Sequence, residues 1–231
     1  MEILKVEHVT KIYGSGENAV RALQDVSFTV PRGEFTAIVG ESGSGKSTLL
    51  NCIGGLDDPT DGKVYINGTD LFAMTEKKRT IFRRRNIGFV FQSFQLIPEL
   101  NVEQNIIFPL LLDYQKPDPT AVEEVLKVLG LADRRRHLPG QLSGGQQQRV
   151  AIGRALITKP MLILADEPTG NLDSKSSQDV MELLTAASRK YRQTILMITH
   201  NMNLTASVDR VLHVSDGILT DLGGKRNEKL S

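Results

Sequence analysis

Apolar and polar residues alternate in three short stretches of the chain, at residues 4–7, 26–30 and 63–66. When residue types alternate at every second position, one face of a strand lies against a core and the other faces solvent. Each stretch therefore predicts a half-buried strand. The third stretch ends at Asn67-Gly68, a dipeptide that favours a tight hairpin turn. The beginning of the chain is therefore predicted to be rich in β structure.

Three further stretches are almost uninterruptedly apolar, at residues 35–39, 161–165 and 194–199. Short runs of this kind are typical of parallel strands that are buried on both faces. The first run leads into glycines, the second ends at Asp166, and the third ends at His200. Because ligands of open α/β sheets gather at the carboxyl ends of the strands, we expect a site where these runs end.

Two segments carry apolar residues at the spacing of an amphipathic helix. The apolar positions are Val122, Val125, Leu126 and Leu129 in the first segment and Val180, Leu183, Leu184 and Ala187 in the second. Thr120, followed three residues later by Glu123, has the spacing of a capping box and predicts the start of the first helix. Gly130 predicts its end.

Strands that alternate with helices predict an α/β core with a mainly parallel sheet. The β-rich start and a helical middle at about residues 93–157 are expected to be additions to that core. We expect one domain over residues 1–222, with the helical part inserted into it. The polar end, residues 223–231, is predicted to be a frayed tail.

Composition narrows the function classes. The 231 residues are 40% apolar and 24% charged, which excludes a disordered or collagen-like chain. The 28 basic residues nearly balance the 27 acidic ones, so a uniformly basic nucleic-acid binder is not expected. The single cysteine, Cys52, rules out an intramolecular disulfide framework and fits a reducing compartment.

No stretch of the sequence is apolar enough to cross a membrane. The longest apolar run, residues 106–112, contains Pro109 and is far shorter than the roughly 20 residues that a bilayer requires. The first seven residues alternate charged and apolar types and do not resemble a signal peptide. Any association with a membrane is therefore expected to run through a partner.

The first motif with a chemical meaning is Gly40-Glu41-Ser42-Gly43-Ser44-Gly45-Lys46-Ser47, which fits G-x-x-x-x-G-K-[ST]. A strand precedes it, and Thr48 continues into a predicted helix, which is the context that a phosphate-binding loop needs. Glycines let successive N–H groups surround phosphate oxygens, and the helix N-terminus adds positive potential. Lys46 is expected to neutralise the terminal phosphates, and the Ser47 hydroxyl to bind Mg²⁺. A chance glycine-rich turn would match in about one chain in a hundred of this length.

Asp166 and Glu167 follow the second apolar run directly. Asp166 is suited to hold Mg²⁺ through water, and Glu167, which points elsewhere, could polarise an attacking water molecule. Such a pair after a strand is usually only part of a loop, but a phosphate loop earlier in the chain favours the functional interpretation.

Leu142-Ser143-Gly144-Gly145-Gln146 has the form of a second anion site. Ser143 is predicted to cap a helix over residues 146–157, and the two glycines leave its first amides open. The simpler interpretation is an ordinary helix start softened by glycine.

Together these segments resemble the nucleotide-binding subunit of an ATP-binding cassette (ABC) transporter, over about residues 1–220. Residues 40–48 are similar to the family's Walker A motif, and residues 142–146 are similar to its LSGGQ signature. Asp166 and Glu167 resemble the Walker B aspartate and the catalytic glutamate, and Gln92 resembles the Q-loop glutamine. Asp173 resembles the D-loop aspartate, His200 the switch histidine, and Tyr13 the aromatic residue that packs against adenine.

The resemblance implies a P-loop NTPase (RecA-like) core, an antiparallel β subdomain at the N-terminus, an inserted α-helical subdomain, and ATP and Mg²⁺ as cofactors. It assigns catalysis to Glu167, His200, Lys46 and Gln92, and Mg²⁺ binding to Ser47, Gln92 and Asp166. Nucleotide contacts are assigned to Tyr13, Gly40, Glu41, Ser42, Gly43, Ser44, Gly45, Lys46, Ser47, Thr48, Gln92, Ser143, Gly144, Gly145, Gln146 and Asp173.

Within the family, residues 54–57, 88–92 and 165–170 resemble the branch of macrolide exporters, lipoprotein-releasing ATPases, the septal cell-division ATPase and peptide-antibiotic resistance ATPases. A common D-loop has the wording Ser-Ala-Leu-Asp, and this chain has Gly170-Asn171 in place of the first two residues.

The resemblance also implies partners. We expect a second copy of the chain, bound head-to-tail around two MgATP, and integral-membrane permease subunits that hold the protein at the cytoplasmic face of the cell membrane. No nucleic-acid partner is expected. The permease should contact residues 93–105, where Ile97 and Leu100 are apolar in a loop; Phe94 and Leu96 could equally pack within the helical part.

Other functions remain to be weighed. A soluble ABC ATPase of DNA repair or translation would carry a long coiled coil or a second cassette, and a GTPase would carry Asn-Lys-x-Asp; this sequence has none of these. Transmembrane signalling or mechanical work without transport stays open. The basic clusters at 77–79 and 83–85 are expected to be a solvated face or one turned to the membrane, and His8, His137 and His213 match no motif.

Overall fold

The structure, a computed structural model, describes residues 1–224. Its strands are β1 (Glu2–Tyr13), β2 (Val20–Pro31), β3 (Phe35–Val39), β4 (Asp61–Ile66), β5 (Thr69–Asp70), β6 (Ile87–Phe91), β7 (Leu162–Asp166), β8 (Thr194–Ile198), β9 (Arg210–Ser215) and β10 (Ile218–Gly224). Its α-helices are α1 (Lys46–Ile53), α2 (Glu76–Asn86), α3 (Val102–Leu112), α4 (Pro119–Val128), α5 (Gly144–Leu156) and α6 (Ser174–Tyr191). Short 3-10 helices are η1 (Gly16–Asn18), η2 (Ala132–Arg134), η3 (Pro139–Gln141) and η4 (Met202–Ser207).

The strands form two sheets. A six-stranded sheet has the order β10-β9-β3-β8-β7-β6, in which only β10 runs antiparallel to its neighbour. A four-stranded antiparallel sheet has the order β2-β1-β4-β5. The α/β core with a mainly parallel sheet and the β-rich addition at the start of the chain are therefore confirmed.

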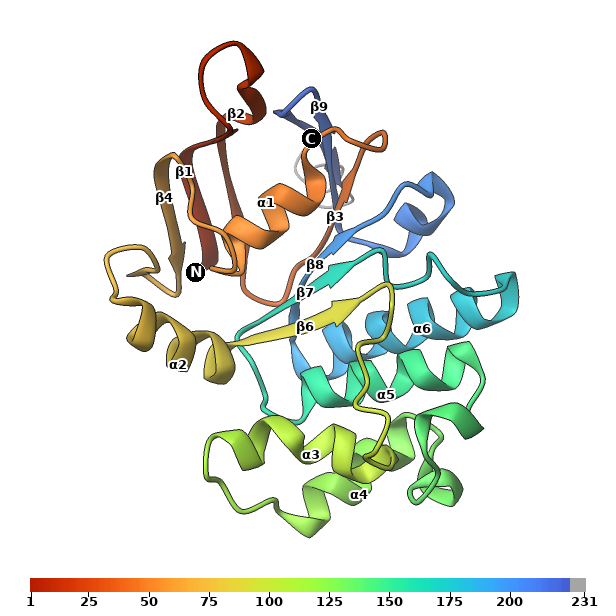
Figure 1. Cartoon of the computed structure of the whole chain (residues 1–231). Helices are drawn as coiled ribbons and strands as arrows, with labels where there is room; N and C mark the ends of the chain where they lie inside the picture. Colours follow the sequence, from red (N-terminus) through yellow and green to blue (C-terminus); the bar gives the residue numbers. More distant parts are fainter. Residues whose placement is uncertain (225–231) are drawn as a thin grey trace.

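Helix α1 lies between the two sheets, and α5 and α6 cover the opposite face of the parallel sheet, with α3 and α4 outside them (Figure 1). One apolar core joins α1 to residues of both sheets, and a second joins the parallel sheet to α3, α4, α5 and α6. All five residues of β3 and of β8 are buried, as their uninterrupted apolar runs predict. The parallel sheet is thus a rigid layer whose carboxyl edge can carry a site.

The start of α4 differs from the prediction. Asp118, and not Thr120, is the N-cap: its carboxylate accepts a hydrogen bond from the Thr120 amide at 2.9 Å, and Pro119 occupies the first helical position. Proline is suited to that position because its fixed φ is helical and its missing N–H would have had no partner there. The capping box predicted at Thr120 is therefore wrong by two residues.

Helix α5 begins at Gly144, two residues before the predicted start, with Ser143 as its N-cap. Ser143 Oγ accepts from the Gln146 amide, and the Gln146 side chain accepts from the Ser143 amide. This reciprocal capping box confirms the cap and moves both glycines into the first turn.

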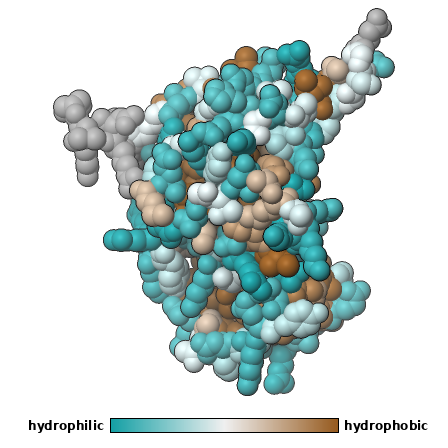
Figure 2. Space-filling model, turned by 90° about the vertical axis from the view of Figure 1, so that its left-hand side faces the viewer, coloured by the Kyte–Doolittle hydropathy of each residue, from teal (hydrophilic) through white to brown (hydrophobic). Residues whose placement is uncertain are grey.

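Helix α2 has no fully buried residue, although Phe82 packs against the first core. Arg79 pairs with Asp58, and Arg84 and Arg85 pair with Asp113. Figure 2 views the side of the molecule on which α2 and the antiparallel sheet lie, and polar residues cover most of it around a few apolar patches. Lys77, Lys78 and Arg85 are exposed, whereas Arg79, Arg83 and Arg84 are half-buried.

Between β6 and β7 the chain carries α3, α4, η2, η3 and α5. At the end of the chain, Gly223 and Gly224 pair with β9, so the strand continues into the segment predicted to be frayed. The rest of that prediction, residues 225–231, lies outside the described residues. None of the helices in residues 1–224 is both long and apolar enough to cross a membrane.

Candidate functional site

The phosphate loop connects β3 to α1 and passes close to two other backbones. Gly40 has φ 151°, and a Cβ there would lie 2.1 Å from the carbonyl oxygen of Val214. Gly45 has φ 105°, and its Cβ would lie 2.3 Å from the carbonyl oxygen of Ala22. Real Cβ atoms do not approach backbone so closely, so both positions require glycine, and the loop is held against β9 and β2.

Lys46 is buried at the start of α1. Its Nζ donates to the carbonyl oxygens of Gly40 at 2.9 Å and Glu41 at 2.5 Å. These partners are neutral, so they fix the position of the ammonium group without cancelling its charge. A phosphate in the loop would meet that charge directly.

Asp166, the last residue of β7, faces the loop. Its Oδ1 accepts a hydrogen bond from Ser47 Oγ at 3.3 Å. Burial raises the pKa of Asp166 above its usual value and the neighbouring Glu167 adds to this, while the Ser47 hydrogen bond and Lys46 lower it. The parallel sheet thus brings together two oxygen atoms that can bind a metal, from residues that are 119 positions apart in the sequence.

These donors suit Mg²⁺ in particular. Within the described part of the chain, no three His, Cys, Asp or Glu side chains form a metal-binding group. Mg²⁺ does not need such a group, because it usually takes one or two carboxylates together with substrate phosphates and waters. The Ser47 hydroxyl and the Asp166 carboxylate therefore fit Mg²⁺ that arrives with a nucleotide.

Glu167 has a left-handed backbone, with φ 47°. Its Oε2 lies 2.9 Å from His200 Nδ1, which follows β8. The approach lacks the alignment of a hydrogen bond, so within residues 1–224 this buried oxygen has no hydrogen-bond partner. A buried carboxylate oxygen without a donor is an acceptor for a water molecule or a reacting proton.

One cavity of about 680 Å³ collects most of these groups. Lys46, Ser47, Gln92, Glu167 and His200 line it together, with Ser42, Gly43, Gly45 and Thr48 of the loop. The predicted catalytic residues thus share one space, although they come from four separate segments.

Part of the cavity wall was missed by the sequence analysis. Residues 20–22 and Gln24 come from β2, and Asp216 and Gly217 come from the turn between β9 and β10. These residues carry no local motif, and only the order of the strands brings them beside the loop. Neither segment could have been found by a search for motifs.

Tyr13 adjoins the cavity without lining it. It pairs in the sheet with Val20, which does line the cavity. Its hydroxyl donates to Asp57 Oδ2 at 2.5 Å, and the Lys11 ammonium lies 4.8 Å from its ring centroid. The ring is therefore held at the edge of the site, where a base could lie against it.

The signature segment does not line this cavity. The start of α5 packs instead on the segment between β7 and α6 and on the first turn of α6. A Cβ at Gly144 would lie 3.4 Å from Leu172 Cδ2, and one at Gly145 would lie 2.8 Å from Ser176 Oγ. Asp173 caps α6 through the Ser176 amide at 2.9 Å. Ser143, Gly144, Gly145, Gln146 and Asp173 thus form a second group, apart from the phosphate loop of their own chain.

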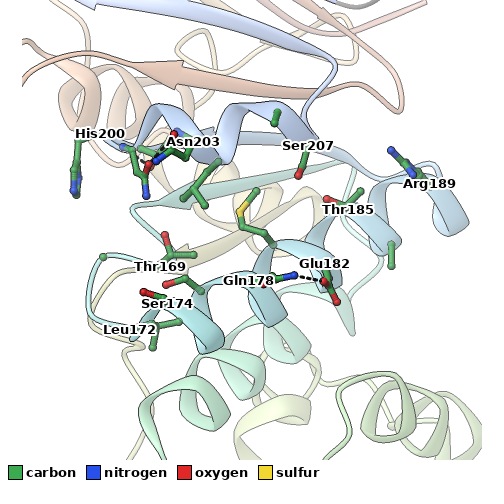
Figure 3. A pocket seen from close by; sticks show the side chains of 18 residues that line it. Thr169, Leu172, Ser174, Gln178, Glu182, Thr185, Arg189, His200, Asn203 and Ser207 are labelled. Atoms are coloured by element: carbon green, nitrogen blue, oxygen red, sulfur yellow. Dashed lines mark hydrogen bonds between the residues drawn. The ribbon is translucent and has the colours of Figure 1, made fainter.

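A larger cavity of about 970 Å³ lies between α6 and η4 (Figure 3). His200 belongs to its lining and to that of the first cavity. Figure 3 shows Thr169, Leu172 and Ser174 at one end and Arg189 at the other, with polar side chains along α6 between them. The histidine therefore stands between two open spaces.

Comparison with known proteins gives a consistent result. Residues 23–170 match the ABC transporter family. The chain is 45% identical over 218 residues to the lipoprotein-releasing system ATP-binding protein LolD of Bordetella avium, covering 94% of this chain and 95% of that protein. It is 47% identical over 217 residues to LolD of Geobacter metallireducens, covering 93% of this chain and 96% of that protein.

Among solved structures, the chain is similar to the ATP-binding cassette MJ0796, described as a dimer in a post-hydrolysis state bound to ADP and Pi. The TM-score is 0.85 at 42% sequence identity, and the match covers 96% of this chain and 99% of that one.

Proposed function

This chain belongs to the ABC transporter family, and we propose that it is the ATPase subunit that forms a head-to-tail dimer around two MgATP and drives a membrane permease. The observation that carries this proposal is a division of the motifs. The phosphate loop, Glu167 and His200 share one cavity, whereas the signature at the start of α5 lies outside it.

The cavity supplies what phosphoryl transfer to water needs. Backbone amides of the loop and the N-terminus of α1 bind the phosphates, and the Lys46 ammonium neutralises the terminal ones. Ser47, Asp166 and Gln92 would hold Mg²⁺, which supplies charge neutralisation on the phosphate oxygens when bound. Glu167 accepts the proton of the attacking water, a contribution of about 10²–10⁴ in rate. His200, beside Glu167, donates to the terminal phosphate.

The second group of motifs has no phosphate of its own to bind. The amides of Gly144 and Gly145 are open at the N-terminus of α5, which is an anion site, whereas the Ser143 amide is bound by the Gln146 side chain. The two glycines pack on residues 172–176 of their own chain, away from the loop. Each chain therefore offers its signature to the ATP of another copy, so that two nucleotides are bound between two chains. The dimeric state named for the similar cassette structure supports this arrangement.

A membrane role rests on the relatives and on one loop. Asn105, at the base of the loop, donates to the carbonyls of Ile97, Leu100 and Asn101 and accepts from the Ile97 amide, which fixes residues 97–101. Ile97 and Leu100 remain half-buried on this rigid loop, whereas Leu96 packs against the second core. We propose that Ile97 and Leu100 contact the permease.

The names of the relatives indicate which kind of cargo the permease moves. Proteins called lipoprotein-releasing ATP-binding proteins match nearly the whole chain, so we propose a permease that extracts or exports lipid-anchored or similarly apolar cargo, with this chain at the cytoplasmic face of the membrane.

The test compares the wild type with Lys46→Ala. We expect the wild type to release phosphate from MgATP and to bind a fluorescent ATP analogue, and Lys46→Ala to lose both, because no other flexible cation of the loop can reach the phosphates. A permease that binds the wild type should co-purify with both proteins. Unchanged binding and turnover in Lys46→Ala would overturn the assignment of the site.

A further inference from the structure

Gln92 and Asn171 form a reciprocal pair beside the proposed site. Gln92 Nε2 donates to Asn171 Oδ1 at 3.1 Å, and Asn171 Nδ2 donates to the backbone carbonyl of Gln92 at 3.2 Å. The two residues are 79 positions apart: Gln92 follows β6, and Asn171 lies in the turn between β7 and α6. Two hydrogen bonds between the same pair fix both the position and the rotation of a side chain.

Gly170 supports this pair. A Cβ at position 170 would lie 2.7 Å from Gln92 Nε2, 3.0 Å from its Cδ and 3.2 Å from its Cγ. The side chain of Gln92 therefore lies against the backbone of Gly170, and a Cβ at position 170 would require its amide end to shift. Gly170-Asn171 is also where the chain departs from the common Ser-Ala-Leu-Asp wording, and an alanine at position 171 could make neither bond.

The pair with Asn171 determines which atom of the Gln92 side-chain amide, Nε2 or Oε1, is available to the site. A backbone carbonyl can only accept, so Asn171 must present its NH₂ group to the Gln92 carbonyl and its Oδ1 to the Gln92 side chain. Oδ1 in turn requires the Nε2 of Gln92 as its donor. The remaining polar atom of the Gln92 side chain is Oε1, and Gln92 lines the cavity that contains Lys46 and Ser47.

We propose that Asn171 is a positioning residue for Mg²⁺: it holds the Gln92 amide so that Oε1, the oxygen Mg²⁺ prefers, is the atom available to the site. This inference rests on the proposed function, which assigns Gln92 to the metal.

The experiment measures how much Mg²⁺ strengthens nucleotide binding. A fluorescent ATP analogue is titrated into the full chain, once with Mg²⁺ and once with EDTA, and the ratio of the two affinities is compared among variants. Asn171→Ala should reduce this ratio about three- to tenfold, the range expected for two exposed hydrogen bonds, and leave the affinity in EDTA unchanged.

Two variants complete the design. Gln92→Ala should reduce the ratio at least as much as Asn171→Ala, and the double variant should be no worse than Gln92→Ala alone, because Asn171 acts only through Gln92. Gln178→Ala is the matched control, since it removes one exposed amide hydrogen bond, to Glu182, on the same helix that follows Asn171. It should keep the wild-type ratio.

The outcomes separate the two proposals. If Asn171→Ala keeps the wild-type ratio, or if its effect adds to that of Gln92→Ala, the positioning role is wrong while the ATPase assignment stands. If the wild type fails to bind the analogue, or if Lys46→Ala binds it as the wild type does, the proposed function itself is wrong.

Discussion

Replacement of Gly45 by alanine tests the geometry of the phosphate loop. The backbone at this position has φ 105°, which costs an L-residue about 1–2 kcal/mol. The new Cβ would also lie 2.3 Å from the carbonyl oxygen of Ala22 in β2, a backbone atom that cannot withdraw without moving the strand. Overpacking of this kind costs about 1–3 kcal/mol.

The two costs together are about 2–5 kcal/mol, and the loop can escape them only by leaving its binding conformation. The apparent affinity for ATP is then the intrinsic affinity multiplied by the fraction of molecules that keep the binding conformation. At 1.4 kcal/mol for each factor of ten, Gly45→Ala should bind ATP at least about thirtyfold more weakly than the wild type.

The assay is titration of a fluorescent ATP analogue, combined with a thermal melt followed by circular dichroism. Gly68→Ala is the control: Gly68 also has a positive φ, 77°, but its Cβ would meet nothing within 4 Å, and it lies in the hairpin turn far along the chain from the loop. This control should lose about 1–2 kcal/mol of stability and keep its affinity for ATP. If Gly45→Ala bound ATP within threefold of the wild-type affinity, the left-handed conformation of Gly45 against Ala22 would be refuted.

Three further predictions concern other parts of the chain. Asp118→Ala should lower the free energy of unfolding in urea by about 0.5–2 kcal/mol, because α4 loses its cap. Thr120→Ala should change the free energy of unfolding by no more than about 0.5 kcal/mol. A larger loss in Thr120→Ala than in Asp118→Ala would show that Thr120 is the cap. Burial raises the pKa of the Cys52 thiol to about 12, so a thiol reagent at pH 8 should modify no native protein and one thiol per chain after unfolding; fast labelling of the native state would contradict this. Ile97→Glu and Leu100→Glu should abolish co-purification of the permease and leave ATP binding unchanged; an unaffected pull-down would exclude this surface.

Much of the site could be predicted because each of its chemical groups belongs to a local pattern. The glycines and Lys46 stand between a strand and a helix, and Asp166 and His200 end apolar runs that became buried parallel strands. Parallel strands align their carboxyl ends, so residues 119 positions apart, Ser47 and Asp166, lie within hydrogen-bond distance. The apolar runs and the motifs that follow them therefore predict the same site, at the carboxyl edge of the parallel sheet.

The parts that could not be predicted depend on contacts between distant segments. The cavity wall from β2 and from the β9–β10 turn follows only from the order of strands in space. The pairing of Gln92 with Asn171 depends on the separation of two loops, which no sequence period encodes. Helix α2 has no fully buried residue, and its sequence shows no apolar period. The cap of α4 is different, since Asp118-Pro119 carries a signal that a search for a capping box overlooks.

Dimer formation by Glu167→Gln is the most direct test of the central claim, that each signature serves the ATP of another chain. The substitution removes the general base and one negative charge beside each terminal phosphate, so hydrolysis should nearly stop and ATP should hold the two chains together. Gly144→Asp adds a carboxylate at the first position of α5, where the side chain meets only ordinary contacts and an acid favours the helix. It should therefore leave the fold intact and repel the partner's phosphate.

Size-exclusion chromatography in saturating MgATP gives the decisive comparison, with nucleotide binding measured for each chain. The account predicts a monomer for the nucleotide-free protein, a dimer for Glu167→Gln with MgATP, and a monomer that still binds ATP when Gly144→Asp is added. A Glu167→Gln protein that stays monomeric in saturating MgATP, or a double variant that still dimerises, would contradict the role of Ser143, Gly144 and Gly145 across the interface.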